Sequence, residues 1–219
     1  MGIYPGSKVE LGGFVARHYD LILDVISFGG YLSMVKRAIE LMEIRPDDKI
    51  LDLGAGTGRN ASLMAGYLSR SENAEILGLD ISPEMIAQFE RRALKFKQLK
   101  VVNQRIDVEL SYRDYFDKVF ISFVLHGFPE NVREIIARNA FRALKPGGKF
   151  FLFDYAEFPL EKMLLPFRFI FKNFECRYAV DFIATDRKQR LAQIGFYDFK
   201  EHFFVRNFLR LLVARKPEE

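Results

Sequence analysis

The decisive stretch of the sequence is Ile50-Leu51-Asp52-Leu53-Gly54-Ala55-Gly56-Thr57-Gly58. It sets an apolar run, from Lys49 to Leu53, directly before three glycines at alternate positions, and the residues from Asn60 to Ser69 then follow a helical pattern. Such a run predicts a buried β-strand, and the glycines predict a loop between that strand and a helix. Glycine lets the backbone approach a ligand closely, and the N–H groups at the start of the helix point at it. The stretch therefore predicts a ligand-binding loop.

Two acidic residues indicate the kind of ligand. Asp52 at the end of the strand would repel a pyrophosphate, but it attracts a ligand that carries an ammonium and a sulfonium. The glycine spacing is one residue tighter than the dinucleotide fingerprint, and no Walker A sequence occurs. Asp80 ends the next predicted strand, where a carboxylate can accept hydrogen bonds from both ribose hydroxyls. Taken alone, the loop is interpretable as a simple turn and Asp80 as a helix cap; together they predict a nucleoside site.

Outward from this loop, short apolar runs alternate with helix-period segments, which is the pattern of βαβ units around a parallel sheet. We expect an α/β fold with a Rossmann-like, doubly wound, seven-stranded, mostly parallel sheet and an antiparallel closing strand. The further predicted strands are Glu75–Asp80, Val101-Val102, Lys118–Phe123, Lys149–Tyr155 and two within Asp198–Ala214 that join near Asn207. The further predicted helices are Ser82 to about Lys97, Asn131–Leu144 before Lys145-Pro146-Gly147-Gly148, and Asp186–Ile194 before Gly195.

Both flanks of the sheet carry additional segments within one predicted domain, residues 1–219. Residues 1–45 are expected to form an N-terminal helical cover, two helices with a hinge at Gly29-Gly30. Residues 156–185 are expected to form an aromatic lid, because phenylalanines and basic residues interleave there, and Pro166 prevents one continuous helix. The simpler interpretation of this lid is core packing; the alternative is contact with an apolar acceptor or an anionic membrane surface.

Composition excludes several classes of protein. Of 219 residues, 49% are hydrophobic and 28% charged, which is typical of a folded globular chain, and charged residues interrupt every apolar stretch. One cysteine and no recognisable secretory signal predict a cytoplasmic address. The net charge of +4 arises after Glu157, where 12 basic residues face 8 acidic ones, too weak an excess for a nucleic-acid-binding surface.

The motifs resemble those of class I S-adenosylmethionine-dependent methyltransferases, through Leu51–Gly58, Gly78–Ser82 and Leu144–Lys149. The match spans roughly residues 45 to 155. A narrower resemblance, to the ubiquinone/menaquinone biosynthesis C-methyltransferase family, extends through Val15–Asp20, Ser27–Gly29 and Ile121–Phe123, and more weakly through Asp181-Phe182 and Ile194–Phe196. It implies an enzyme with S-adenosyl-L-methionine as its cofactor and a small-molecule methyl acceptor.

The resemblance also implies roles for individual residues. The methionine end of the cofactor would be held by Asp52, Gly54, Ala55, Gly56, Thr57 and Gly58, and Tyr19 would close over it. The ribose would be bound by Asp80. The adenine would contact Ile81, Met85, Asp107 and Val108, and Ser122 would make a further contact with the cofactor. Two positions depart from the quinone enzymes. Arg59 follows Gly58 where those enzymes resemble Gly-Asp, and Leu125-His126-Gly127 stands where they carry an Arg-Asn pair. These departures affect the expected acceptor more than the expected cofactor.

His126 is the candidate catalytic residue, because it follows the fourth predicted strand and an imidazole suits removal of a hydroxyl proton. The simpler interpretation is that it packs a loop. No Asn/Asp-Pro-Pro-Tyr/Phe tetrad follows Ile121, which disfavours methylation of amides and of the exocyclic amines of bases. Cys176 is expected to be a small buried side chain, and no metal ion is expected.

We therefore expect methyl transfer to a small, apolar molecule, with C-methylation of a quinone-type acceptor as the leading candidate. The alternatives are methylation of an amine or phospholipid head group, a nicotinamide-dependent oxidoreductase, and a noncatalytic nucleoside-binding protein. The sequence alone identifies neither the acceptor nor the oligomeric state.

Overall fold

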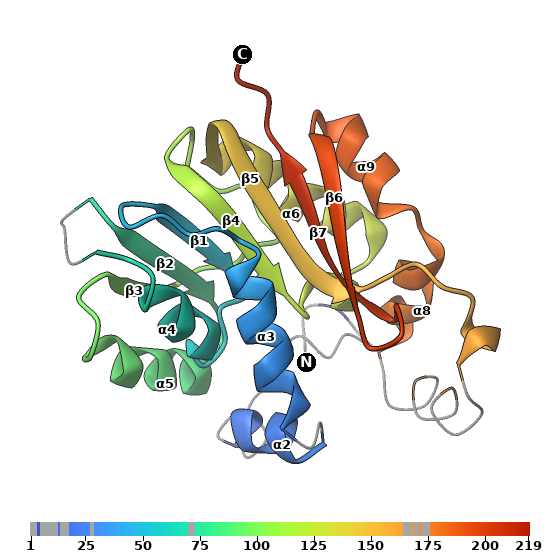
Figure 1. Ribbon diagram of the computed structural model, residues 1–219, viewed down its shortest axis with the longest axis horizontal. Helices are drawn as coiled ribbons and strands as arrows, with labels where there is room; N and C mark the ends of the chain where they lie inside the picture. Colours follow the sequence, from blue (N-terminus) through green and yellow to red (C-terminus); the bar gives the residue numbers. More distant parts are fainter. Residues whose placement is uncertain are drawn as a thin grey trace.

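The fold is built around a seven-stranded sheet. The structure is a computed structural model, and it describes residues 4, 13, 18–26, 29–69, 73–163, 168, 171 and 176–219. The strand order of the sheet is β3-β2-β1-β4-β5-β7-β6 (Figure 1). Neighbouring strands from β3 to β5 are parallel, whereas β7 is antiparallel to both β5 and β6. The predicted sheet is therefore confirmed. The strands are β1 (Lys49–Leu53), β2 (Glu75–Asp80), β3 (Leu99–Asn103), β4 (Phe116–Ser122), β5 (Leu144–Tyr155), β6 (Tyr197–Phe204) and β7 (Leu209–Arg215).

Helices cover both faces of the sheet (Figure 1). One face packs against α3 (Gly30–Glu40), α4 (Arg59–Ala65) and α5 (Pro83–Ala93), and α2 (Tyr19–Ile26) precedes α3. The other face packs against α6 (Glu130–Ala143), α8 (Arg177–Ala184) and α9 (Arg187–Ile194). Two short 3₁₀ helices, η1 (Leu125–Gly127) and η2 (Leu160–Lys162), follow β4 and β5.

Successive residues of the central strands enter opposite cores, because side chains in a strand alternate between the two faces. In β4, Val119 and Ile121 belong to the cluster under α6, whereas Phe120 belongs to the cluster under α3 and α4. All three are fully buried. A strand buried on both faces needs a continuous apolar run, which is why these strands are recognisable in the sequence.

Helix ends differ most from the predictions. The helix after β1 ends at Ala65 rather than Ser69, where the chain turns back and the Ser69 amide donates to the Pro46 carbonyl. The helix after β2 ends at Ala93 rather than near Lys97, and Leu94 beyond it is 88% exposed. Strand β5 begins at Leu144, directly after α6. Helix α8 was not predicted at all.

Other predicted signals are confirmed where the chain is described. Ser82 caps α5, Gly195 ends α9 in a left-handed conformation, and Gly29 separates α2 from α3. The break at Pro166, most of the Phe-rich stretch, and residues 15–17 and 27–28 of the resemblance lie outside the described residues. No helix in the described ranges is long and apolar enough to cross a bilayer.

Substitution at Gly78 tests the packing that places β2 beneath the glycine loop. A Cβ there would lie 2.6 Å from Cε2 of Phe89 and 2.8 Å from Cβ of Ala55, so Gly78→Ala forces the buried Phe89 ring to move. We expect a loss of about 1–3 kcal/mol in the free energy of unfolding, measured by urea denaturation. Gly30→Ala is the control, since a Cβ there meets nothing within 4 Å. Equal stability of the two variants would contradict this account of the packing.

Candidate functional site

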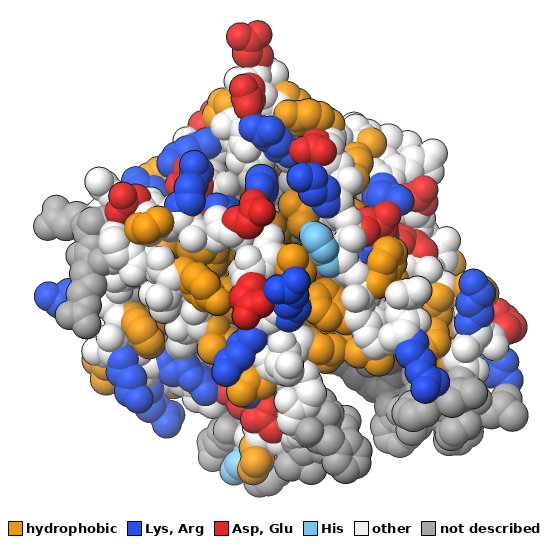
Figure 2. All heavy atoms as spheres, in the orientation of Figure 1, with side chains coloured by type: hydrophobic (Ala, Val, Ile, Leu, Met, Phe, Trp, Pro, Cys, Tyr) orange, Lys and Arg blue, Asp and Glu red, His pale blue; other side chains and the backbone are white. Residues whose placement is uncertain are grey.

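A cavity of about 1550 Å³ lies at the edge of the sheet where β1, β2, β4 and β5 end. Ligands of open α/β sheets bind at this edge, beside the point where the strand order reverses, here between β1 and β4. The volume exceeds the roughly 300–1,000 Å³ of common small-molecule pockets, so a nucleoside and a second molecule have room together. In the space-filling view, acidic and basic side chains intermix over the visible face, and hydrophobic side chains show in its lower central recess (Figure 2).

The glycine loop forms one wall of this cavity. The amides of Gly54 and Ala55 donate to the Leu79 carbonyl at 2.9 and 3.0 Å, which ties the loop to β2. Gly56 has φ +54, and a Cβ on it would meet no protein atom within 4 Å. Since Gly56 lines the cavity, any side chain there would occupy space that a ligand needs. The loop is thus shaped for close approach of a ligand to the backbone.

Asp80 fixes the same loop from the end of β2. Its Oδ2 accepts a hydrogen bond from the Gly56 amide at 2.8 Å, and its Oδ1 accepts from the amides of Ile81 and Ser82 at 2.8 and 2.9 Å. A carboxylate offers about four lone-pair directions, so Oδ2 retains capacity for a ligand hydroxyl. Asp80 therefore holds the loop and faces the cavity, whereas the N-cap of α5 is Ser82.

Asp52 lies outside the cavity wall, although the sequence predicted a direct contact. Its Oδ2 is buried and has no hydrogen-bond partner among the described residues. Burial, with a smaller contribution from the charge of Asp80, raises the pKa of the Asp52 carboxyl to about 7. A buried carboxylate of this kind is stabilised by a nearby positive charge and destabilised by a negative one. The site therefore suits a cationic ligand better than a diphosphate.

Ion pairs and hydrogen bonds hold α2, with Tyr19 at its start, against the glycine loop. The Thr57 hydroxyl donates to Asp20 at 3.0 Å, and Arg59 pairs with Asp24 at 2.8 Å. Tyr19 also lines the cavity. Arg59, one of the departures from the quinone enzymes, thus has a local partner on α2.

Of the residues predicted to contact the adenine, only some line the cavity. Ile81, Met85 and Asp107 line it. The Asp107 carboxylate accepts hydrogen bonds from the Tyr4 hydroxyl and from Arg105 Nη2, both at 2.6 Å. Burial opposes ionisation of Asp107, but these hydrogen bonds outweigh it and lower its pKa, while burial and Asp107 raise the pKa of Tyr4 to about 12.

Gly58 and Val108 do not line the cavity. A Cβ on Gly58 would lie 2.6 Å from Cδ2 of Phe89, so this glycine allows α5 to pack closely against the loop. Val108 is 42% exposed, and its carbonyl accepts a hydrogen bond from Asn139 Nδ2 at 2.7 Å. Both residues act in packing and loop structure in this arrangement.

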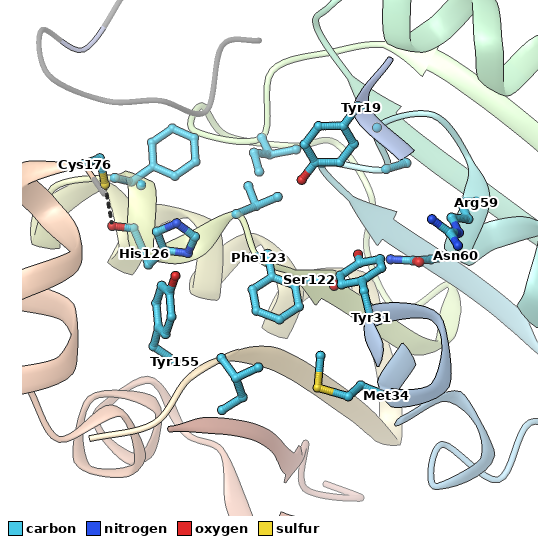
Figure 3. A pocket seen from close by; sticks show the side chains of 18 of the residues that line it. Tyr19, Tyr31, Met34, Arg59, Asn60, Ser122, Phe123, His126, Tyr155 and Cys176 are labelled. Atoms are coloured by element: carbon cyan, nitrogen blue, oxygen red, sulfur yellow. Dashed lines mark hydrogen bonds between the residues drawn. The ribbon is translucent and has the colours of Figure 1, made fainter. Parts of the chain in front are cut away.

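Ser122 and Phe123 lie where the cavity passes from its polar half to its apolar half. In the close view, Tyr31, Asn60 and Arg59 stand on one side of Phe123, and His126 and Tyr155 stand on the other (Figure 3). Phe123 has φ +54, a strained conformation for a bulky residue of the kind that clusters at functional sites. The apolar half is lined by Val124, Phe128, Tyr155, Phe158, Met163, Phe171, Phe203, Val205, Phe208 and Leu209.

His126 lies in the wall of the apolar half, so the prediction that it reaches the ligand edge agrees with its position. Its Nδ1 is 2.7 Å from Oδ1 of Asp154, a buried residue near the end of β5. Its ring stands edge-on to Tyr155, with centroids 5.1 Å apart. Cys176 is buried as expected, and its thiol donates to the His126 carbonyl at 3.7 Å (Figure 3).

Residues 50–148 match the protein family described as "Methyltransferase domain". Over these residues the chain is similar to methyltransferase domains. It is 32% identical over 138 residues to demethylmenaquinone methyltransferase of Bacillus mycoides (strain KBAB4), a match that covers 62% of this chain. The chain spans only 56% of that relative's length.

Two solved structures share the methyltransferase fold at low identity. One belongs to a Haloferax volcanii complex between the Trm112 methyltransferase activator and a methyltransferase, with TM-score 0.68 and 17% identity over 94% of this chain and 98% of that one. The other is Haemonchus contortus phosphoethanolamine N-methyltransferase 2 with S-adenosylhomocysteine, with TM-score 0.62 and 16% identity over 80% of this chain and 50% of that one.

Sequence reasoning missed several residues of this site. Tyr31 and Asn60 come from helices, and nothing in their sequence context marks them. Asp154 carried a usable signal, since it lies near the carboxyl end of the fifth predicted strand, where site residues gather. No group of three His, Cys, Asp or Glu side chains in the described ranges is arranged to hold a metal ion.

The pH dependence of stability tests the environment of Asp52. Its pKa is about 7 in the folded state against 3.8 as the ordinary value, so the folded state retains a proton that the unfolded chain releases between these pH values. Stability from this group is present below about pH 4 and is lost as the pH rises through 7. Asp52→Asn should therefore gain stability relative to the parent between pH 5 and pH 8, by about 2 kcal/mol or more in urea denaturation.

Asp198→Asn, at an exposed carboxylate, is the matched control and should follow the parent at both pH values. A constant difference between Asp52→Asn and the parent would rule out a buried, raised-pKa carboxyl at position 52.

Proposed function

We propose that this chain transfers a methyl group from S-adenosyl-L-methionine to a small, mostly apolar acceptor that carries a hydroxyl group. A quinol-type ring, methylated on carbon, is the leading candidate. When bound, S-adenosylmethionine supplies the methyl group on a positively charged sulfur. The observation that carries the proposal is the continuity of one cavity from the glycine loop to the aromatic wall around His126.

The polar half of the cavity supports the cofactor. Gly56 leaves room beside the backbone, Asp80 can receive ribose hydroxyls, and the Asp52 carboxyl behind the wall favours a ligand with positive charge. Ile81 and Met85 offer apolar surface on which an adenine can lie. These features agree with the methyltransferase domain match and with the methyltransferase activity for which the similar proteins are named.

The apolar half supports the acceptor. Phenylalanines and Tyr155 dominate its wall, and they provide large apolar surface for a ring or a hydrocarbon chain. Lys162 and Arg206 also line the cavity. The demethylmenaquinone methyltransferases among the relatives make a quinol the first acceptor to test.

His126 would accept the proton that the acceptor releases. The bond from methyl carbon to sulfur breaks as the bond to the acceptor forms, and the electron pair of the broken bond stays on sulfur. The acceptor hydroxyl gives its proton to the imidazole, which makes the oxygen and the adjacent ring carbon more nucleophilic. For methylation on carbon, the ring carbon then releases its hydrogen as a proton to solvent, and the imidazolium returns its proton to the oxygen, which restores the hydroxyl. The surrounding walls align the two reactants, which is the main contribution that such a displacement needs.

Cofactor binding tests the polar half. Gly56→Ala places a methyl group in the cavity, so we expect at least a tenfold loss of affinity for S-adenosylhomocysteine in isothermal titration calorimetry. Gly147→Ala is the matched control, because Gly147 has φ +74 and a Cβ there makes only ordinary contacts away from the site. It carries similar backbone strain and should bind as the parent does. Stabilisation of the parent by NAD but not by S-adenosylhomocysteine would favour the oxidoreductase and refute the proposal.

Turnover tests the apolar half. With S-adenosylmethionine and a short-chain demethylmenaquinol, the parent should form S-adenosylhomocysteine and a product heavier by one methylene, as measured by mass spectrometry. The oxidised quinone, which has no hydroxyl, should give none. His126→Gln should lower turnover about 10²–10⁴-fold with unchanged affinity for S-adenosylhomocysteine.

Other acceptors separate the alternatives. Methylation of phosphoethanolamine and not of the quinol would favour an amine acceptor. Cofactor binding without product from any acceptor in a cell extract would favour the noncatalytic nucleoside-binding protein. Full activity of His126→Gln would remove His126 as the base.

A further inference from the structure

Asp154 is an unassigned acidic residue directly behind His126. It is 1% exposed and lies near the end of β5. Its Oδ1 contacts His126 Nδ1 at 2.7 Å and accepts the Tyr155 amide at 2.8 Å, and its Oδ2 accepts the His126 amide at 3.2 Å. One carboxylate thus binds both the ring and the backbone of His126.

The carbonyl side of His126 is held as well. Arg133 Nη2 donates to the His126 carbonyl at 3.2 Å, and the Cys176 thiol donates to it at 3.7 Å. Arg133 is 2% exposed, and its Nη1 pairs with Glu130 at 3.0 Å and with Asp181 at 2.7 Å. These contacts hold His126 at its ring Nδ1, its amide and its carbonyl.

We propose that Asp154 is a positioning residue that fixes the proton of His126 on Nδ1, so that Nε2 is the nitrogen that takes the acceptor's proton. The part of this inference that concerns proton transfer from the acceptor rests on the proposed function. An ionised carboxylate only accepts hydrogen bonds, so Nδ1 must carry the hydrogen in this pair. The neutral ring then has its basic lone pair on Nε2. The same arrangement stabilises the imidazolium that forms after proton transfer.

The charges around the ring favour this role over a purely structural one. Asp154 from β5 makes a charged contact with the ring, Tyr155 meets the ring edge-on, and Cys176 reaches the carbonyl of the same residue. Arg133 from α6 contacts that carbonyl rather than the ring, and two carboxylates offset its charge. If Asp154 served only to bind the His126 backbone amide, its carboxylate would not need to contact the imidazole ring as well.

The inference narrows the acceptor class. A His126 ring whose Nε2 is kept ready to accept a proton contributes to catalysis only when the nucleophile must lose a proton. It therefore favours an acceptor with an ionisable hydroxyl, such as a phenol, a hydroquinone or an enol, over a tertiary amine or a thioether.

Nuclear magnetic resonance of the histidine rings tests the inference without any acceptor. The chain has three histidines, His18, His126 and His202, so long-range ¹H–¹⁵N spectra are assignable with three single variants. The parent should show the Nδ1–H tautomer of His126 at neutral pH. The titration midpoint of His126 should fall in Asp154→Asn, since the neighbouring negative charge is lost, while His18 and His202 keep theirs.

Asp48→Asn is the matched control, because Asp48 is 2% exposed and pairs with Lys118 away from the cavity. It should leave the His126 signals unchanged. An Nε2–H tautomer in the parent, or an Asp154→Asn titration equal to that of the parent, would overturn the inference. If Asp154→Asn does not fold, as judged by circular dichroism, the parent's tautomer decides the question.

Activity supplies a second readout that separates this inference from the proposed function. With a methylated quinol as product, Asp154→Asn should lower kcat at least tenfold and leave the KM for S-adenosylmethionine unchanged. A parent that methylates no acceptor would refute the proposed function and leave the tautomer result standing. Unchanged kcat across the pH range in Asp154→Asn would refute the positioning role alone.

Discussion

The site depends on the attachment of the glycine loop to β2. Two loop amides, of Gly54 and Ala55, share the Leu79 carbonyl, and a third, of Gly56, donates to the Asp80 carboxylate. These bonds hold the backbone of the glycine loop at the cavity wall, in a place where the side chain of any other residue would extend into the cavity. A loop with left-handed residues loses much conformational freedom on folding, so the bonds to β2 are needed to keep it in one conformation. The same carboxylate that fixes the loop also faces the ligand, which couples the shape of the site to its charge.

Local patterns explain which parts of the fold the sequence predicted. Strands β1, β2 and β4 are buried on both faces, so their continuous apolar runs identified them, and the loop after β1 carries its information in nine consecutive residues. Helix ends were less predictable. Leu94 fits a helical apolar pattern, yet α5 ends before it and its side chain is 88% exposed.

Contacts between distant residues explain what the sequence did not reveal. His126 and Asp154 are 28 positions apart, and Arg59 and Asp24 are 35 apart. Nothing in the composition around either residue names its partner, and the pairs exist only because the sheet brings the ends of β4 and β5 together and because α2 lies over the glycine loop. Asp52 shows the converse case. Its position in the motif was informative, but its burial behind the wall was not visible in the sequence.

The chemistry at the acceptor end must be derived from side chains, because the fold is shared by proteins with different activities. The two similar solved structures share the sheet at 16–17% identity, and an identity this low carries no information about an acceptor. In this chain the wall opposite the glycine loop is rich in aromatic residues, and His126, an ionisable residue in that wall, is bound from behind by a buried carboxylate. A carboxylate with 1% exposure is costly to bury unless its hydrogen bonds compensate. The three hydrogen bonds of Asp154 all go to His126 and to Tyr155, which follows Asp154 in β5. The contacts that compensate for burial of this carboxylate therefore also fix the imidazole of His126.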